Sequence, residues 1–377
     1  MRRRVRALAA GAWLAAAGCA APPRPPAPTV VPGVSHAAGA ATPLVIAHRG
    51  ASGHRPEHTL AAYDLAITMG ADYVEPDLVM TRDSVLVARH EAEIGGTTDV
   101  ADRFPARRTT KTFGGRPVTG WFVEDFTLAE LKMLRARERL PTRSHAHDGQ
   151  FPVPTFDEVL SLVARRARET GRPIGIYPET KHPAHFRALG LPLEERLAAA
   201  LRGPGREATP VFVQSFSAAS LVRARALLAG VPGVRYVQLV GAPGVAEDAP
   251  AGFEAPGAIV TPAGLAAVRR YADAIGAEKT LVLPLAPGDT AVPAATALVA
   301  DAHRAGLLVH VWTLRGDAPF LPATYRGDPG AEWRRLAALG VDGLFGDFPD
   351  QGRAALGAPA PGLPAAPRRG NGATDRN

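Results

Sequence analysis

Cysteine is nearly absent from the sequence, with a single residue in 377 positions. One cysteine cannot form an internal disulfide, which excludes a small domain held together by disulfide bonds. It also excludes a zinc or iron–sulfur site built from several cysteines of this chain. Aromatic residues make up only 6% of the chain, yet 46% of it is hydrophobic. A chain of this length and composition can bury a large core, so a wholly disordered or collagen-like protein is excluded.

The whole chain has a net charge of +7, but most of its length carries no excess of basic residues. The surplus positive charge lies near the two ends, at Arg2, Arg3, Arg4, Arg6, Arg24, Arg368, Arg369 and Arg376. Residues 43–356 carry no net charge. Because affinity for a nucleic-acid backbone depends on clustered Lys and Arg side chains, we expect no nucleic-acid partner.

The N-terminus lacks an apolar run long enough to span a bilayer. Its arginines precede a short apolar stretch, residues 7–17, whereas a membrane-spanning helix needs about 20 residues. A basic segment, a short apolar stretch and small residues before a cleavage point are typical of a secretory signal. The sequence Ala16-Ala17-Gly18-Cys19 resembles a bacterial lipobox. We therefore predict a lipoprotein signal peptide over 1–18, lipidation of Cys19, and an exported, membrane-anchored protein that faces the periplasm or the cell exterior.

Two further segments have the composition of flexible chain. Residues 20–41 are rich in Pro and Ala, which predicts a semi-extended tether over 19–42 between the lipid and a folded domain. Residues 357–377 are predicted to be a disordered tail. One domain is expected between them, over 43–356. The sequence leaves the oligomeric state open.

Short apolar runs alternate with helical patterns through this domain, which is typical of βα units around a parallel sheet. The predicted strands are Leu44–His48, Tyr73–Val79, Val85–His90, Ile174–Glu179, Val211–Ser215, Tyr236–Val240, Leu281–Pro284, Leu307–Thr313 and Gly343–Gly346. The predicted helices between them are Thr59–Met69, Phe156–Thr170, Ala218–Ala229, Ala263–Ala274, Ala294–Ala305 and Ala331–Leu339. Capping boxes at Thr155 and Thr127 open the second helix and a short helix over Leu128–Leu134.

The number and spacing of these elements favour an α/β fold of the (β/α)₈ TIM-barrel type over two separate domains. Nine strands are one too many, so Leu281–Pro284 is predicted to be peripheral unless the predicted boundaries are shifted. A polar, glycine-rich insertion of about 91–154 follows the third predicted strand. His145 and His147 within it are predicted to be solvated.

Familiar catalytic motifs are absent: the sequence contains no G-x-S-x-G, no phosphate-binding G-x-x-x-x-G-K-[ST] and no H-E-x-x-H. Polar residues instead follow the apolar runs. The first predicted strand ends in His48 and Arg49, at the strand end where barrel active sites lie. In the second, Glu75 and Asp77 are two residues apart and share one face of the strand. Two carboxylates side by side in an apolar setting would be costly unless a cation holds them.

The next two predicted strands also end in polar residues. Val85–His90 ends in His90, and Ile174–Glu179 ends in Glu179, with Lys181 two residues later. Three carboxylates without cysteine favour a hard cation bound by oxygen, Ca²⁺ or Mg²⁺, over zinc. The sequence therefore predicts a metal site on Glu75, Asp77 and Glu179.

Four stretches of the chain together resemble the glycerophosphodiester phosphodiesterases, and most closely their bacterial periplasmic type. The four are His48–Gly53, Pro56–Thr59, Gly70–Asp83 and Gly175–Lys181. Further similar segments, Thr98–Pro105, Asp125–Leu128, Val213–Phe216 and Gly343–Asp350, extend the resemblance over nearly all of 44–350. The combined motif set is highly specific.

The resemblance implies a TIM barrel, a divalent cation (typically Ca²⁺) on the three carboxylates, and acid–base catalysis by His48 and His90. It also implies that Arg49 and Lys181 hold the substrate phosphate. One position departs from the family, because Glu91 follows His90 where the family usually has Asp. That neighbouring carboxylate is the residue expected to orient the imidazole.

The expected reaction cleaves a small-molecule glycerophosphodiester, such as glycerophosphocholine or glycerophosphoethanolamine, to glycerol 3-phosphate and an alcohol. One histidine would activate the nucleophile and the other would protonate the departing oxygen. The sequence does not assign these two roles, nor does it choose between water and the glycerol 2-hydroxyl as nucleophile.

Two alternatives are a surface lipoprotein with a binding role on a vestigial barrel, and a lysophospholipase D-like activity. Phe216 and Trp312 could line an alcohol pocket, although completion of the core is the favoured interpretation.

Overall fold

The computed structural model describes residues 42–113, 115–203, 209–244 and 246–357. The predicted signal peptide, the lipidation site Cys19, nearly all of the predicted tether and the predicted tail from 358 onward lie outside these residues. No helix in the described ranges has both the length and the apolar character needed to cross a membrane.

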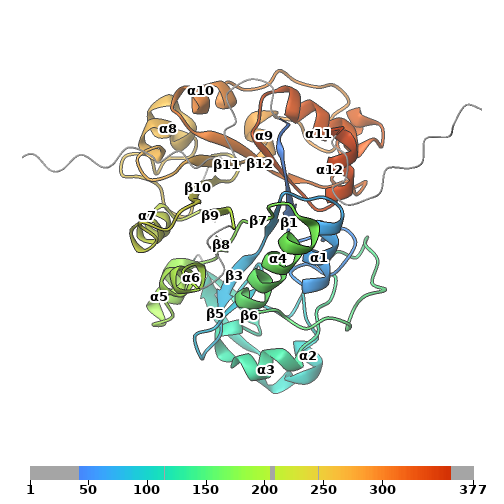
Figure 1. Cartoon of the computed structure of the whole chain (residues 1–377), viewed down its shortest axis with the longest axis vertical. Helices are drawn as coiled ribbons and strands as arrows, with labels where there is room; N and C mark the ends of the chain where they lie inside the picture. Colours follow the sequence, from blue (N-terminus) through green and yellow to red (C-terminus); the bar gives the residue numbers. More distant parts are fainter. Residues whose placement is uncertain (1–41, 114, 204–208, 245, 358–377) are drawn as a thin grey trace, which may run out of the picture. The chain divides into compact units, whose positions relative to one another are not determined.

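Eight parallel strand positions close into a ring in the described part of the chain, which confirms the predicted (β/α)₈ barrel (Figure 1). In ring order they are β1 (Leu44–His48), β2 (Tyr73–Glu75) with β3 (Asp77–Met80), β7 (Gly175–Ile176) with β8 (Glu179–Thr180), β9 (Val211–Ser215), β10 (Val234–Val240), β11 (Ala274–Glu278), β12 (Leu308–Leu314) and β13 (Gly343–Gly346). Strand β1 closes the ring because it pairs in parallel with both β2 and β13.

Two of these strand positions are interrupted by proline. Pro76 separates β2 from β3, and Pro178 lies between β7 and β8. Proline has no backbone N–H to donate to a neighbouring strand, so one ladder donor is missing at each interruption, although both proline carbonyls still accept from the neighbouring strand. The register is nevertheless kept across both breaks, since Asp77 pairs with Glu179. The prolines thus lie directly beside the predicted metal-binding carboxylates.

The third predicted strand is a strand, but its direction and place in the barrel differ from the prediction. Strand β4 (Leu86–Ala88) runs antiparallel to β3 and lies outside the parallel ring. Its apolar run resembles that of a buried barrel strand, and the sequence offers no sign of its direction. The insertion therefore begins after a hairpin attached to the second barrel strand.

The prediction for the region 263–284 was wrong in two respects. Leu281–Pro284 belongs partly to helix α9 (Lys279–Val282), and the sixth barrel strand is β11 (Ala274–Glu278). The sequence Ala-Ile-Gly-Ala-Glu has low strand propensity and was missed for that reason. Gly276 packs closely, because a Cβ there would lie 2.6 Å from the Leu239 side chain.

Helices surround the barrel in Figure 1. They are α1 (Leu60–Thr68), α4 (Phe156–Thr170), α5 (Pro183–Ala188), α6 (Leu193–Leu201), α7 (Ala218–Leu227), α8 (Pro262–Val268), α10 (Leu298–Arg304), α11 (Pro329–Ala338) and α12 (Pro349–Ala355). The capping box at Thr155 is confirmed: its side chain accepts from the Glu158 N–H, and the Glu158 carboxylate accepts from the Thr155 N–H. Helix α4 ends at Gly171, whose φ of 67° suits glycine. Helices α5, α6 and α12 were not predicted.

The insertion folds into short elements of its own. They are α2 (Val100–Arg103), β5 (Thr109–Phe113), β6 (Arg116–Gly120) and α3 (Leu128–Met133), with 3₁₀ turns at Pro105–Arg107 and Val123–Asp125. Phe122, Phe126 and Leu131 bury their side chains in the main hydrophobic core. His145 is solvent-exposed, as predicted, whereas His147 is partly buried.

The barrel interior below the strand ends is closed by aromatic packing. Tyr73, Tyr177, Phe212 and Phe345 form a compact cluster with Ile46, Val237 and Ala274. The rings of Tyr177 and Phe212 stack with centroids 5.0 Å apart. Ile46 lies two residues before His48 on β1, so the two side chains are on the same face of the strand. The cluster therefore forms an apolar floor beneath the polar residues at the carboxyl end of the strand.

Candidate active site

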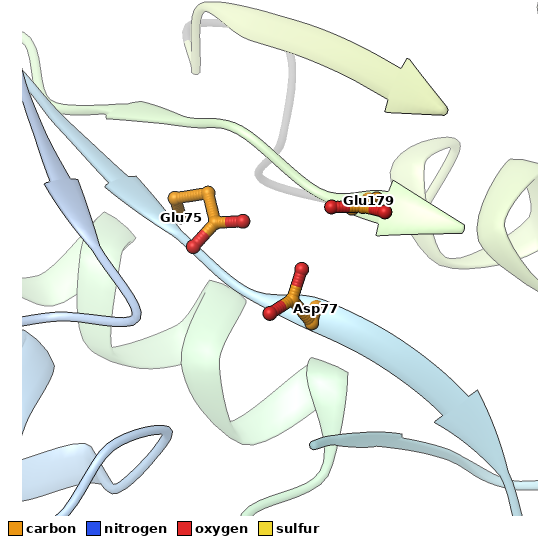
Figure 2. Close-up of side chains that lie close together, drawn as sticks. All are labelled: Glu75, Asp77 and Glu179. Carbon is orange, nitrogen blue, oxygen red and sulfur yellow. The ribbon is translucent and has the colours of Figure 1, made fainter. Parts of the chain in front are cut away.

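Three carboxylates meet at the carboxyl ends of adjacent barrel strands. Figure 2 shows the carboxyl groups of Glu75, Asp77 and Glu179 facing one another from β2, β3 and β8. One oxygen of each lies within 4.8 Å of the others, and all three residues are buried. The two-residue spacing of Glu75 and Asp77 therefore places both side chains on the inner face, as the sequence predicted.

The electrostatics of this cluster favour a bound cation. Burial and repulsion from the neighbouring carboxylates raise the pKa of Glu75 well above its usual value. Burial and the nearby Asp77 raise the pKa of Glu179 to about 8, even though Lys181 opposes the shift. In addition, the buried Asp77 Oδ1 has no hydrogen-bond partner among the residues that the structure describes. Clustered carboxylates with a free oxygen are the ligand set that hard divalent cations prefer.

Four other oxygens of the cluster each contact a nitrogen of a neighbouring residue. Glu75 Oε2 accepts from the backbone N–H of Arg49 at 2.8 Å, and its Oε1 accepts from the Gln214 amide at 2.9 Å. Asp77 Oδ2 lies 2.9 Å from His58 Nε2. Glu179 Oε1 lies 2.9 Å from Lys181 Nζ. These contacts fix each carboxylate and leave Asp77 Oδ1 as a free ligand atom.

His48 is oriented by a buried carboxylate at the end of β13. Its Nδ1 lies 2.6 Å from Asp347 Oδ1, and its Nε2 lies 3.2 Å from Arg49 Nε, an N–H donor. This arrangement places the proton on Nδ1 and leaves the Nε2 lone pair as an acceptor. Burial and the positive charge of Arg49 lower the pKa of His48 to about 4, although Asp347 opposes the shift. The imidazole is therefore neutral at neutral pH and can accept a proton.

His90 reaches the same site by an unexpected route. The sequence placed it at the end of a parallel strand, but it follows β4, the antiparallel return of the hairpin from β3. Its Nε2 lies 3.2 Å from Lys181 Nζ. Its Nδ1 lies 2.8 Å from Glu91 Oε1, so the longer glutamate side chain does reach the imidazole. Burial and the positive charges of Arg49 and Lys181 lower the pKa of His90.

Arg49 lies between the first histidine and the carboxylates. Its Nη1 donates to Glu57 Oε1 at 3.0 Å, and its Nε lies 3.4 Å from Asp77 Oδ2. The Arg49 backbone has a φ of 59°, which is uncommon for a residue other than glycine. Such strained residues cluster at functional sites, where the surrounding structure holds them in place. The Arg49 and Lys181 side chains thus supply two buried positive charges beside the carboxylate cluster.

Four residues that contact the predicted site residues were not predicted as site residues: Glu57, His58, Gln214 and Asp347. All four lie in segments that carry the family resemblance, which was the signal available for them. Asp347 and His48 are 299 positions apart, so no local pattern could have paired them.

The two aromatic residues considered for an alcohol pocket are half-buried. The rings of Phe216 and Trp312 pack edge to face with centroids 5.7 Å apart. Lys181 Nζ lies 5.8 Å from the centre of the Phe216 ring, so the pair adjoins the charged site. Trp312 also packs against the aromatic floor of the barrel. Part of its side chain therefore completes the core, which is the favoured interpretation.

The fold and the site define a TIM-barrel enzyme with carboxylates, histidines and cationic side chains at the carboxyl ends of its strands. Residues 48–351 match the model of the Glycerophosphoryl diester phosphodiesterase family, and the chain belongs to this family. A glycerophosphodiester phosphodiesterase of Arabidopsis thaliana is 36% identical, covering 81% of this chain and 84% of its own length. One of Haemophilus influenzae is 31% identical, covering 82% and 88%. The chain is therefore a glycerophosphodiester phosphodiesterase, a phosphoric diester hydrolase.

Solved structures show the same fold. A glycerophosphodiester phosphodiesterase of Agrobacterium tumefaciens matches with a TM-score of 0.54 at 21% identity, covering 83% of this chain and 99% of its own. A phosphodiesterase of Oleispira antarctica, in complex with the product sn-glycerol-3-phosphate, matches with a TM-score of 0.56 at 22% identity, covering 84% and 98%.

Proposed function

We propose that this enzyme hydrolyses glycerophosphodiesters such as glycerophosphocholine and glycerophosphoethanolamine to sn-glycerol 3-phosphate and a free alcohol. The observation that carries the proposal is the link of two imidazoles to one carboxylate cluster, His48 through Arg49 and His90 through Lys181. The product bound to the Oleispira antarctica phosphodiesterase supports the same product here.

Glu75, Asp77 and Glu179 would hold a divalent cation, and we propose Ca²⁺, with Mg²⁺ as the alternative. The fit rests on their oxygens within 4.8 Å of one another and on the free Asp77 Oδ1. When bound, the cation would supply positive charge that offsets the negative charge of the phosphodiester.

Arg49 and Lys181 would bind the phosphate oxygens. A phosphodiester repels an incoming nucleophile, so its charge has to be neutralised before proton transfer can help. Both side chains are buried, which strengthens their interaction with an anion relative to water. A guanidinium can also contact two phosphate oxygens at once, which fixes the orientation of the substrate.

The histidines would move the protons. One imidazole takes the proton from the nucleophile, whose oxygen forms a new bond to phosphorus. The other gives a proton to the alcohol oxygen as its bond to phosphorus breaks. His48 is suited to the base role, because its Nδ1 proton is held by Asp347 and its Nε2 is an acceptor. The nucleophile is water, or the glycerol 2-hydroxyl followed by hydrolysis of the cyclic phosphate.

The catalytic proposal is tested by the release of glycerol 3-phosphate from glycerophosphocholine, with and without a chelator. Chelation, and separately His48→Ala or His90→Ala, should reduce turnover by about 100-fold or more. Added Ca²⁺ should restore the chelated enzyme. His145→Ala is the control, because that histidine is exposed and its ion pair is with the nearby Asp148 of the insertion. Full activity after chelation would exclude the metal role, and full activity of both histidine variants would exclude the acid–base role.

Lysophosphatidylcholine tests the lysophospholipase D-like alternative. Release of choline from this lipid at a rate comparable to that from glycerophosphocholine would extend the substrate class to lysophospholipids. Hydrolysis of glycerophosphocholine alone would support the proposed class.

We also propose, from the sequence alone, that the chain is an exported lipoprotein of the periplasmic type, cleaved after Gly18 and lipidated on Cys19. The Pro- and Ala-rich tether over 19–42 would join the lipid to the barrel. Fractionation of cells that express the full chain provides the test. The wild-type protein should sediment with membranes and Cys19→Ala should not; equal behaviour of the two would contradict lipidation.

A further inference from the structure

Two arginines of the insertion contact residues that lie beside the active site. Arg139 and Arg143 lie in one loop of the insertion, between helices α3 and α4. Each forms an ion pair with a buried acidic residue outside the insertion, Glu57 and Asp347 respectively. Other arginines of this region make contacts of a different kind; Arg137, for example, pairs with Asp102 inside the insertion.

Arg143 and Arg315 both contact Oδ2 of Asp347, and the contact of Arg143 is the shorter of the two. The Arg143 guanidinium, with only 4% of the side chain exposed, contacts Asp347 Oδ2 at 2.5 Å and Asp317 Oδ2 at 2.7 Å. It also donates to the Ser52 carbonyl at 3.1 Å. The other oxygen of Asp347 is the one that contacts His48 Nδ1 at 2.6 Å. Arg143 therefore reaches His48 through a single shared carboxylate.

Arg139 is placed in the same way with respect to the neighbouring residue. Its Nε lies 2.7 Å from Glu57 Oε2, while Glu57 Oε1 accepts from Arg49 Nη1 at 3.0 Å. A carboxylate that is bound at both oxygens cannot rotate freely. Glu57, held by Arg139, therefore fixes the orientation of the Arg49 guanidinium. Consecutive site residues, His48 and Arg49, are thus each oriented by a carboxylate whose far oxygen is bound by the insertion.

We propose that Arg139 and Arg143 are positioning residues, through which the insertion completes the active site. Arg143 fixes the orientation of His48 by way of Asp347, and Arg139 fixes that of Arg49 by way of Glu57. The proposal rests on the proposed roles of His48 in proton transfer and Arg49 in phosphate binding. It follows that the two arginines affect different kinetic constants, although they come from one loop.

Steady-state kinetics of purified full-length variants on glycerophosphocholine test this division. Arg143→Ala should lower kcat by about 10- to 100-fold, with KM within about twofold of the wild type. Arg139→Ala should raise KM by about tenfold with a smaller change in kcat, because it loosens a phosphate-binding side chain. The control Arg137→Ala should change neither constant, since its partner Asp102 is an exposed residue of the insertion itself.

Conservative variants and thermal melting separate positioning from simple loss of fold. Arg143→Lys keeps the charge but cannot span Asp347 and Asp317 in the same way, so kcat should recover only in part. Wild-type kcat and KM in both alanine variants would overturn the proposal. So would parallel losses in both that match a loss of folded protein on melting. Inactive His48→Ala together with wild-type-like Arg143→Ala would overturn this inference alone, whereas fully active His48→Ala would overturn the proposed function.

Discussion

The two histidines of the site lie in contrasting surroundings. His48 is oriented by Asp347, whose side chain is 2% exposed and is also contacted by Arg143 and Arg315. His90 is oriented by Glu91, whose side chain is 52% exposed and whose second oxygen contacts His182 at 3.1 Å. A buried carboxylate with several fixed partners has little freedom, while an exposed one is screened by water. The comparison indicates that His48 is held rigidly and that His90 is held by a weaker, adjustable contact.

The largest effect is expected at the buried carboxylate. Asp347→Asn keeps the size of the side chain, but it removes the charge and allows the imidazole of His48 to turn or change tautomer. We expect kcat to fall by about 10³- to 10⁴-fold, the upper value being the loss that follows when the carboxylate that orients a catalytic histidine is replaced by an amide. Steady-state kinetics with a melting curve provide the measurement. A loss of less than fivefold would show that the rigid surroundings of His48 are unimportant for turnover.

A second effect concerns folding stability below neutral pH. The pKa of His48 is about 4 in the folded protein, against 6.5 ordinarily. Between these values the unfolded chain binds a proton that the folded chain does not, so stability falls as pH decreases from 6.5 to 4. The slope from this group is at most about 1.4 kcal/mol per pH unit. The pKa of His90 is lowered further, to about 3, but 30% of its side chain is exposed to water that screens such interactions, so we expect His90 to contribute less.

Urea denaturation at pH 7 and pH 5 measures this effect. His48→Gln should flatten the pH dependence more than His90→Gln. An equal flattening by the two variants would contradict the contrast between their surroundings.

The smallest effect is expected at the exposed carboxylate. Glu91→Gln should lower kcat by only about fivefold, in line with the modest energy of a solvent-exposed ion pair. Glu91→Asp should lie closer to the wild type, because it retains the charge. Steady-state kinetics on glycerophosphocholine measure this effect. A fall in kcat as large as that of Asp347→Asn would contradict the contrast between the two histidines.

The structure brings the residues predicted for the site close together, while their roles stay predictions and the path of the chain to His90 differs from the expected one. His48, Glu75, Asp77 and Glu179 each follow or end an apolar run, and the register of parallel strands brings such residues together. His90 was placed at the site for the wrong reason, because an apolar run does not reveal the direction of a strand. The family resemblance supplied the pairing of roles that periodicity could not.

Two other features were out of reach of local patterns. Strand β11 consists mainly of small residues selected by close packing, such as Gly276 against Leu239, and this packing is a property of the assembled barrel. The contacts of Asp347 with His48 and of Arg143 with Asp347 join residues 299 and 204 positions apart. Their existence depends on the closure of the whole ring.

The hairpin formed by β3 and β4 makes His90 dependent on a turn far from the chemistry. The turn is held by Thr81, whose hydroxyl donates to Asp83 and accepts from the Val85 N–H, and by Ser84 with a φ of 63°. Side chains alternate along a strand, so a one-residue deletion in this turn would reverse the facing of every residue after it. Glu91 would then occupy the position of His90 beside Lys181. A length change in a surface turn would thus act as an active-site mutation, while the parallel barrel itself stayed intact.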